Sequence, residues 1–224
     1  MFRLALLSVF ALALTAQSLD QPQPFRARRS SSFRENGANM DAKRVPPGES
    51  FTIADIRGAG RIVHTWITLA IDDPNYLDNI WIKMYWDGAS EPAVEAPFGD
   101  FHALGHGRVA PVNSSLVTVV ARPELNFNLS NRNVAGFNTY FSMPYARGAK
   151  IVIENRSAQE LRSLYYQVDY QEHRRAPSPL RFHARYMETE PEEAEPGAGR
   201  FESINADGAE SGYSNEAVYT VTGR

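Results

Sequence analysis

The sequence contains no cysteine. This absence excludes a disulfide framework, thiolate chemistry and every zinc or iron–sulfur site that depends on cysteine ligands. An excess of positive charge is also missing, because 23 Lys and Arg residues stand against 26 Asp and Glu residues, for a formal net charge of -3. Nucleic acids and membrane surfaces attract basic proteins, so neither is expected as a partner.

Long apolar runs are equally scarce. One run, residues 4–14, is apolar apart from Ser8 and follows the basic residue Arg3. It is too short to span a bilayer comfortably, and small residues follow it, as in a cleavable secretory signal. The sequence therefore predicts a signal peptide over residues 1–20, a secreted or periplasmic protein, and no membrane segment in the mature form. An uncleaved N-terminal anchor is the alternative.

The rest of the chain divides by composition into four parts. Residues 21–49 are polar, basic and rich in Pro, Gly and Ser, which predicts an extended arm. Residues 50–186 form a series of short β-like segments and predict one jelly-roll domain. Residues 187–200 predict an acidic linker. Residues 201–224 are a tail that includes the alternating segment "EAVYTV", and we expect it to be poorly packed, as the start of a second domain.

Apolar and polar residues alternate strictly through the middle of the chain. In "NIWIKMYWDG", residues Ile80, Ile82, Met84 and Trp86 share one face, and Asp87-Gly88 supplies a turn. The segment "RSLYYQVDY" alternates in the same way, and about eight such segments are separated by turn residues. Each half-apolar sheet must bury its apolar face, so the sequence predicts an all-β fold, an antiparallel jelly-roll β-sandwich.

Two details of the packing follow from this pattern. In "RIVHTWITL", alternation places Val63 on the same face as Ile67 and Leu69, and places Ile62 on the opposite face with His64. The core is expected to be aromatic and to include all three tryptophans.

The segment "PFGDFHALGHGRV", residues 97–109, contains several residues that could bind a metal or take part in catalysis. On a strand, His102 and His106 would lie about 13 Å apart at roughly 3.3 Å per residue, whereas zinc binds nitrogen at about 2 Å. The three glycines of the segment disfavour a helix that would bring the two rings together. The sequence therefore predicts a glycine-rich loop and no metal site.

A catalytic interpretation of this segment rests on two weak signals. Asp100 and His102 are placed to face one side of the chain, and Glu95 with Asp100 offers a pair of carboxylates. No G-x-S-x-G nucleophile elbow accompanies them. The residues alone indicate an exported β-sandwich without a cofactor and without a defined mechanism.

Five ordered segments carry a resemblance to a known family. They are "RSSSFRENGANMD", "IADIRGAGRIVHTWIT", "MYWDGASEPAVEAPFGDFHALGHG", "GFNTYFSMPYARGAKIVIENRS" and "LYYQVDY". In this order they resemble the N-terminal half of domain-of-unknown-function family 2961, now placed in glycoside hydrolase family 172. The similarity runs from about Arg29 to Tyr186 and covers most of the chain that follows the predicted signal.

The resemblance implies an exported enzyme that acts on D-arabinofuranosides or fructofuranosides with retention of configuration. It also implies two jelly-roll domains per chain and assembly as trimers or their multiples. The two catalytic glutamates of the family lie in the second domain, in segments similar to G-E-G-D-D and G-T-G-T-E-D-Y. Neither segment occurs in this sequence, so the resemblance assigns no catalytic residue to this chain.

Three functions remain open at this point. The first and preferred one is the non-catalytic N-terminal half of a furanosidase, truncated before the catalytic glutamates. The second is a stand-alone secreted jelly-roll module that binds glycans or assembles. The third is an independent hydrolase or metalloenzyme that uses Asp100 and the histidines. The expected partners are a furanoside glycan and, if the family assembly is kept, further copies of the chain in a trimer-based oligomer.

Candidate sugar-binding residues are the polar residues of the family-like segments, because amides, carboxylates and hydroxyls bond sugar hydroxyls directionally and a tyrosine offers a ring face. They are Ser32, Arg34, Asn39 and Asp41 in the arm, Asp100 and His102 in the glycine-rich segment, and Asn138 and Tyr140. Asn and Asp in loops also form Asx-turns, which is the structural alternative for each of them.

Overall fold

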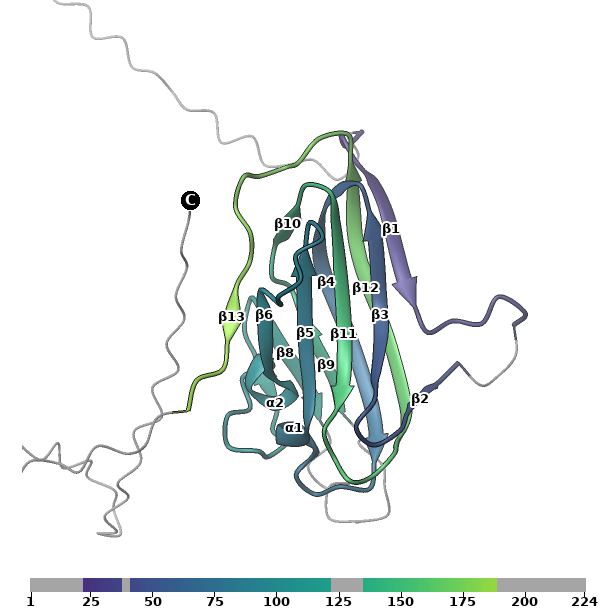
Figure 1. The fold of residues 1–224 in the computed structure, drawn as a ribbon, viewed down its shortest axis with the longest axis vertical. Helices are drawn as coiled ribbons and strands as arrows, with labels where there is room; N and C mark the ends of the chain where they lie inside the picture. The colour runs from purple at the N-terminus through teal and green to yellow at the C-terminus, as the bar shows by residue number, and fades with distance from the viewer. Residues whose placement is uncertain (1–21, 38–40, 122–134, 189–224) are drawn as a thin grey trace, which may run out of the picture.

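Two β-sheets pack face to face in the computed structural model, which describes residues 22–37, 41–121 and 135–188 (Figure 1). The larger sheet has the strand order β1-β12-β4-β9-β8-β7, and β10 and β2 pair with the ends of β4 and β12. Its strands are β1 (Arg26–Ser31), β2 (Lys43–Val45), β4 (Ala59–Ile71), β7 (Val112–Asn113), β8 (Val117–Ala121), β9 (Ala135–Thr139), β10 (Met143–Tyr145) and β12 (Leu161–His173).

The smaller sheet has five strands in the order β13-β6-β5-β11-β3. Its strands are β3 (Ser50–Arg57), β5 (Ile80–Trp86), β6 (Val94–Pro97), β11 (Gly148–Asn155) and β13 (Ala184–Arg185). Among the described strands, β13 and β6 form a parallel pair and the other pairs are antiparallel. The predicted all-β, antiparallel sandwich is therefore confirmed.

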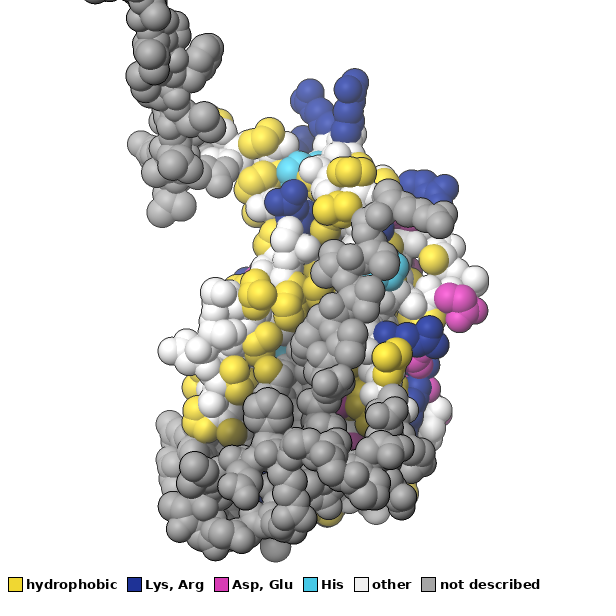
Figure 2. Space-filling model, turned by 90° about the vertical axis from the view of Figure 1, so that its left-hand side faces the viewer, with side chains coloured by type: hydrophobic (Ala, Val, Ile, Leu, Met, Phe, Trp, Pro, Cys, Tyr) yellow, Lys and Arg dark blue, Asp and Glu magenta, His cyan; other side chains and the backbone are white. Residues whose placement is uncertain are grey.

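The two ends of the sandwich differ in structure. Two short helices, α1 (Tyr76–Asn79) and α2 (Phe98–Phe101), lie at the lower end in Figure 1. The upper end holds the turn between β3 and β4 and the last residues of β12, and dark-blue Lys and Arg side chains project from it (Figure 2). No helix of the described residues is long and apolar enough to cross a membrane.

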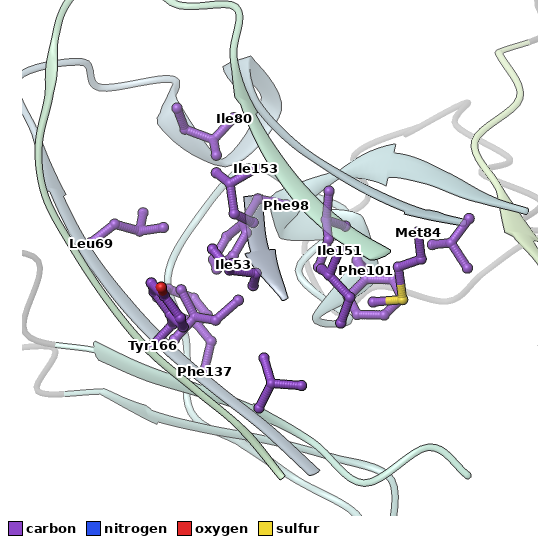
Figure 3. Close-up of a cluster of buried hydrophobic side chains, with 14 of the residues drawn as sticks. Ile53, Leu69, Ile80, Met84, Phe98, Phe101, Phe137, Ile151, Ile153 and Tyr166 are labelled. Atoms are coloured by element: carbon purple, nitrogen blue, oxygen red, sulfur yellow. The ribbon is translucent and has the colours of Figure 1, made fainter. Parts of the chain in front are cut away.

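Aliphatic residues supply most of the core between the sheets (Figure 3). Ile82, Met84, Ile151 and Ile153 of the smaller sheet are fully buried, as the alternation in β5 and β11 requires. Burial of one such side chain stabilises the fold by about 1.5–3 kcal/mol. Phe98, Phe137 and Tyr166 join this core, so it is less aromatic than predicted.

The prediction that all three tryptophans lie in the core was wrong for two of them. Trp86 is buried, but Trp66 and Trp81 lie on the outer faces of the two sheets, where they are partly exposed. Each alternates with buried neighbours, so strand periodicity and not hydrophobicity decides its face.

A β-bulge in β4 overturns the predicted face of two residues. Ile62 is fully buried together with Ile67 and Leu69, whereas Val63 is partly exposed. The register with β12 explains the change, because His64 lies opposite Asp169 and Ile62 lies opposite the next residue, Tyr170. One extra residue in β4 shifts the alternation, as a bulge does.

The segment predicted as an arm, residues 21–49, contributes two strands to the larger sheet. β1 pairs with β12 from Arg26, opposite Glu172, to Ser31, opposite Gln167. β2 pairs with the other end of β12. The sandwich therefore begins before Ser50. The predicted signal peptide, most of the acidic linker and the tail lie outside the described residues.

Candidate functional site

Five polar and aromatic residues meet on the outer face of the larger sheet. They are Arg29 of β1, His64 of β4, Asn138 of β9, Tyr140 after β9, and Asp169 of β12. We refer to them as the outer-face cluster. The register explains why they meet, because Arg29 and His64 both lie opposite Asp169, and Asn138 lies opposite Trp66, two residues after His64. Residues opposite one another share a face of the sheet.

His64 is the centre of the cluster. Its Nδ1 lies 2.9 Å from Asp169 Oδ2, and its Nε2 lies 3.1 Å from Asn138 Oδ1. The Asn138 amide is held in turn by its Nδ2, which donates to the Thr118 carbonyl at 3.4 Å. These contacts fix the plane of the imidazole at both edges.

Asp169 is held by two basic groups. Arg29 donates from Nε to Oδ1 at 2.6 Å and from Nη2 to Oδ2 at 3.1 Å, which is a two-point contact. Partial burial works against ionisation of Asp169, but the hydrogen bonds from Arg29 and His64 outweigh it and lower the pKa of this carboxyl. Asp169 is therefore a stable carboxylate that positions its neighbours and is not suited to donate a proton.

Tyr140 covers the outer side of His64. The two rings are stacked, with centroids 4.9 Å apart and an angle of 18° between their planes. The Tyr140 backbone N–H donates to the Leu116 carbonyl at 2.8 Å, which anchors the residue to the start of β8. The side chain is nevertheless 44 % exposed. The cluster thus combines the exposed aromatic ring of Tyr140 with the amide of Asn138 and the guanidinium of Arg29.

The glycine-rich segment 97–109 has a different character. Its first residues form α2, directly after β6, so the predicted loop contains one short helix. His102 follows this helix and is fully buried, in contact with the rings of Phe98, Phe101 and Phe137. Its Nδ1 bonds the Phe98 carbonyl at 2.8 Å, while Nε2 is buried and has no hydrogen-bond partner among the residues that the structure describes.

This burial removes His102 from the candidate sugar ligands, because a side chain with no accessible surface cannot contact a glycan. It also lowers the pKa of His102 to about 4, since the core disfavours the charged ring. His106, in contrast, is exposed. The two histidines occupy different environments, and the described residues contain no group of three or more His, Cys, Asp or Glu that could hold a metal ion.

Asp100 lies within α2, which follows the end of β6 directly, and its backbone carbonyl accepts a local bond from the Ala103 N–H at 3.1 Å. Partial burial and the nearby charge of Asp78 raise its pKa. Gly105 and Gly107 lie against these two carboxylates, because a Cβ on them would approach Asp100 Oδ1 to 3.2 Å and Asp78 Oδ2 to 3.1 Å.

The candidate residues between positions 21 and 49 form no contact with the outer-face cluster within the described part of the chain. Ser32 is buried, and its Oγ accepts a bond from the Tyr166 N–H at 3.4 Å. Asp41 Oδ1 accepts a bond from the Arg34 N–H at 3.2 Å, across a turn. Asn39 lies outside the described residues. Of the predicted candidates among the described residues, only Asn138 and Tyr140 belong to the outer-face cluster.

Sequence reasoning missed Arg29, His64 and Asp169. In the sequence, Asp169 lies 140 residues from Arg29 and 105 residues from His64. His64 lies 74 residues from its other partner, Asn138. The available signal was the outward position of His64 and Asp169 in two strongly alternating segments. That signal identifies a face but does not say which strands are neighbours.

A comparison with models of protein families identifies the family of this domain. The family model described as the GH172 first beta-sandwich domain matches residues 23–190, which include both sheets and the outer-face cluster. No curated protein matches the chain. The match covers most of the sequence and agrees with the two packed sheets. The chain therefore belongs to glycoside hydrolase family 172, of which it contains the first β-sandwich domain.

Proposed function

We propose that this domain is the non-catalytic N-terminal jelly-roll half of an exported, retaining furanoside hydrolase, and that it contacts carbohydrate through the outer-face cluster. The membership of glycoside hydrolase family 172 supports the enzyme class. The expected substrates are D-arabinofuranosides or fructofuranosides, which follow from the family resemblance.

Three carboxylates of the domain are held in ways that agree with a non-catalytic role. A retaining mechanism needs two carboxyl groups about 5–5.5 Å apart, one of them free to attack the sugar. Asp169 is held by Arg29 and His64. Glu95 and Glu154 are each bridged to both Lys83 and Arg156. Ion pairs of this kind keep a carboxylate in place and reduce its nucleophilicity.

The contact with carbohydrate rests on the exposed Tyr140 ring above a fixed His64. Sugar rings stack on aromatic faces, and neighbouring amides bond their hydroxyls. One Asn138 N–H is directed at the Thr118 carbonyl, which leaves the other for a ligand. Stacking on His64 holds the tyrosine ring before the ligand arrives, which reduces the entropy lost on binding.

The test is the binding of arabinofuranosyl and fructofuranosyl oligosaccharides to the full chain by isothermal titration calorimetry. Replacing Tyr140 by Ala is expected to weaken binding about tenfold, as the loss of about 1.4 kcal/mol of stacking would. The matched control is Tyr186→Ala, because Tyr186 has a similar exposure of 40 % but packs against Trp81 of the smaller sheet. Equal weakening by both variants would contradict the proposed surface.

The lack of catalysis is tested in the same preparations. The purified chain should release no more sugar from these substrates than a buffer control. Burial and the charge of Asp78 raise the pKa of the Asp100 carboxyl, which is the direction that a general acid requires, so the critical variant is Asp100→Ala. Turnover that disappears in Asp100→Ala would contradict the non-catalytic role and favour an independent hydrolase.

A second candidate function is assembly, in the trimer-based form that the resemblance implies. It is favoured by exposed apolar residues at and before β8, since Leu116 is 48 % and Val120 is 68 % exposed. Exposed apolar patches often mark protein interfaces. Light scattering on the full chain tests it: Val120→Lys should convert a trimer or its multiple to monomer, and a monomeric wild-type chain would rule it out.

A further inference from the structure

Six arginines gather at the upper end of the sandwich. They are Arg26, Arg57, Arg61, Arg147, Arg174 and Arg175, and we refer to this surface as the arginine end. The topology explains the grouping: β1 begins at Arg26, β3 ends at Arg57, and the two arginines 174 and 175 follow β12 directly. Figure 2 shows Lys and Arg side chains projecting at this end.

The register ties these strand ends together. Arg26 lies opposite Glu172, which in turn lies opposite Gly60, the neighbour of Arg61. Arg57 lies opposite Gly148, which follows Arg147. The Gly58 N–H also donates to the Arg147 carbonyl at 2.9 Å. The six residues therefore come from adjacent chain segments of both sheets.

Two carboxylates at this end form their ion pairs with arginines outside the six. Asp87 binds the Arg181 side chain and accepts bonds from the Ala146 and Arg147 N–H groups, and Arg147 Nη2 donates to the Asp87 carbonyl at 2.7 Å. Glu172 binds Arg28 at 2.8 Å, and the charge of Arg26 acts on the same carboxylate more weakly. No ion pair within the described residues involves any of the six.

Two further observations concern Arg61. Arg61 Nε is buried and has no hydrogen-bond partner among the described residues. Burial and, after it, the charge of Arg61 lower the pKa of His173.

This concentration is unusual for the chain as a whole, whose formal net charge is -3. Lys43, Lys83 and Lys150 are its only lysines, so 20 of its 23 basic residues are arginines. Arginine presents a planar set of N–H donors that matches a carboxylate or phosphate group at two points. Several unpaired guanidinium groups at one end repel one another, and an anionic ligand would relieve that repulsion.

We propose that the arginine end binds an acidic polysaccharide through the carboxylates of its uronate residues. The choice of a glycan rests on the proposed function, in which this domain serves a glycoside hydrolase. A polymer fits better than a small anion, because the six arginines are spread over several strand ends and turns. The arginine end would thus hold a charged region of a glycan, apart from the neutral sugar contact at Tyr140.

The experiment titrates the full chain with polygalacturonate at about 50 mM and about 300 mM NaCl, with neutral dextran as the uncharged comparison. The test variant is the triple substitution Arg57→Gln, Arg174→Gln and Arg175→Gln. The control triple, Arg44→Gln, Arg108→Gln and Arg185→Gln, removes the same charge from exposed arginines elsewhere. We expect polygalacturonate to bind and dextran not to bind. The test triple should weaken binding about tenfold and the control triple less than twofold.

Further probes identify the class of partner. Inorganic polyphosphate distinguishes carboxylate from phosphate recognition, and duplex DNA and vesicles of anionic phospholipid represent other polyanions. Tighter binding of any of them than of polygalacturonate, at equal charge concentration, would overturn the proposal. Equal weakening by the two triple variants, or no binding of polygalacturonate, would do the same.

One variant separates this inference from the proposed function. Tyr140→Ala should bind polygalacturonate as the wild type does, even if it loses neutral furanosides. Loss of polygalacturonate binding in Tyr140→Ala would place the acidic ligand on the outer-face cluster and contradict the inference. Failure of neutral furanosides to bind the wild type would contradict the proposed function alone.

Discussion

Two histidines contact aromatic rings in this domain, and their surroundings are opposite. His102, in the segment 97–109, is enclosed by three phenylalanines, and one of its ring nitrogens has no hydrogen-bond partner within the part of the chain that the structure describes. His64, on the outer face of the larger sheet, has a partner at each nitrogen and lies beneath an exposed tyrosine. The segment 97–109, which the sequence suggested as a reactive site, contributes His102 to the core. The outer face of the larger sheet carries the groups that a ligand can reach.

The largest expected difference between the two regions is in stability. His102→Ala should lower the free energy of unfolding by about 3 kcal/mol, because it opens a cavity among buried rings. His64→Ala should lower it by about 1 kcal/mol, since His64 is partly exposed and its hydrogen bonds are replaced by water. Chemical denaturation of both variants measures the contrast. Similar losses would show that the outer-face cluster is as much a part of the core as the segment 97–109.

A matched pair of glycine substitutions sharpens the same contrast. A Cβ at Gly99 would lie 2.9 Å from Leu77 Cβ and 3.3 Å from two backbone carbonyl oxygens, so Gly99→Ala should cost about 2 kcal/mol. A Cβ at Gly136 would lie 3.0 Å from Trp66 Nε1, the end of a partly exposed side chain that can move. Gly136→Ala should therefore cost less than about 1 kcal/mol. Thermal unfolding ranks the two variants, and the reverse order would contradict the packing described for α2.

The pH dependence of stability should come in part from His102. Its pKa is lowered from 6.5 to about 4 by burial, so the unfolded chain binds a proton between these values and the folded chain does not. The stability that this group contributes is complete above about pH 6.5 and falls as the pH is lowered toward 4, by up to about 3 kcal/mol. His102→Met should flatten the curve between pH 6.5 and pH 4.5, above the range where most carboxylates titrate. An unchanged slope in this variant would contradict the burial of His102.

A smaller effect is expected from the ion pairs of the outer face. Asp169→Asn should lower stability by only about 1 kcal/mol, because Arg29 and His64 are partly exposed and water screens their charges. The same change should weaken furanoside binding, since His64 and Tyr140 would lose their fixed position. Stability by denaturation and affinity by calorimetry must be measured together. A large loss of stability without a loss of affinity would make Asp169 a purely structural residue.

The sequence predicted the sandwich where one face of a strand is buried, as in β5 and β12, since burial produces alternation. It did not predict β1, whose residues Arg26 to Arg29 are all exposed, because a strand that buries little has no apolar pattern. The bulge at Val63 was missed because one extra residue shifts the phase of the apolar alternation without adding a residue type that marks a bulge. His102 was assigned to a polar loop. It lies four residues after Phe98, however, and side chains at this spacing contact one another on a helical turn.

The candidate site was predictable only in part. Asn138 and Tyr140 are close in sequence and fall in one family-like segment. Arg29, His64 and Asp169 come together through the register of three strands, which alternation does not specify. Long-range pairing of this kind needs the structure.

In the proposed function, the outer face of the larger sheet, and not the segment 97–109, receives the sugar. Amide chemical-shift mapping tests it directly, with the ¹⁵N-labelled full chain titrated with an arabinofuranosyl or fructofuranosyl oligosaccharide. We expect the largest amide shift changes at His64, Asn138, Tyr140 and Asp169, and no change for the amides of Gly99 to Gly107. Shifts concentrated between Gly99 and Gly107, with the outer-face cluster unaffected, would contradict it.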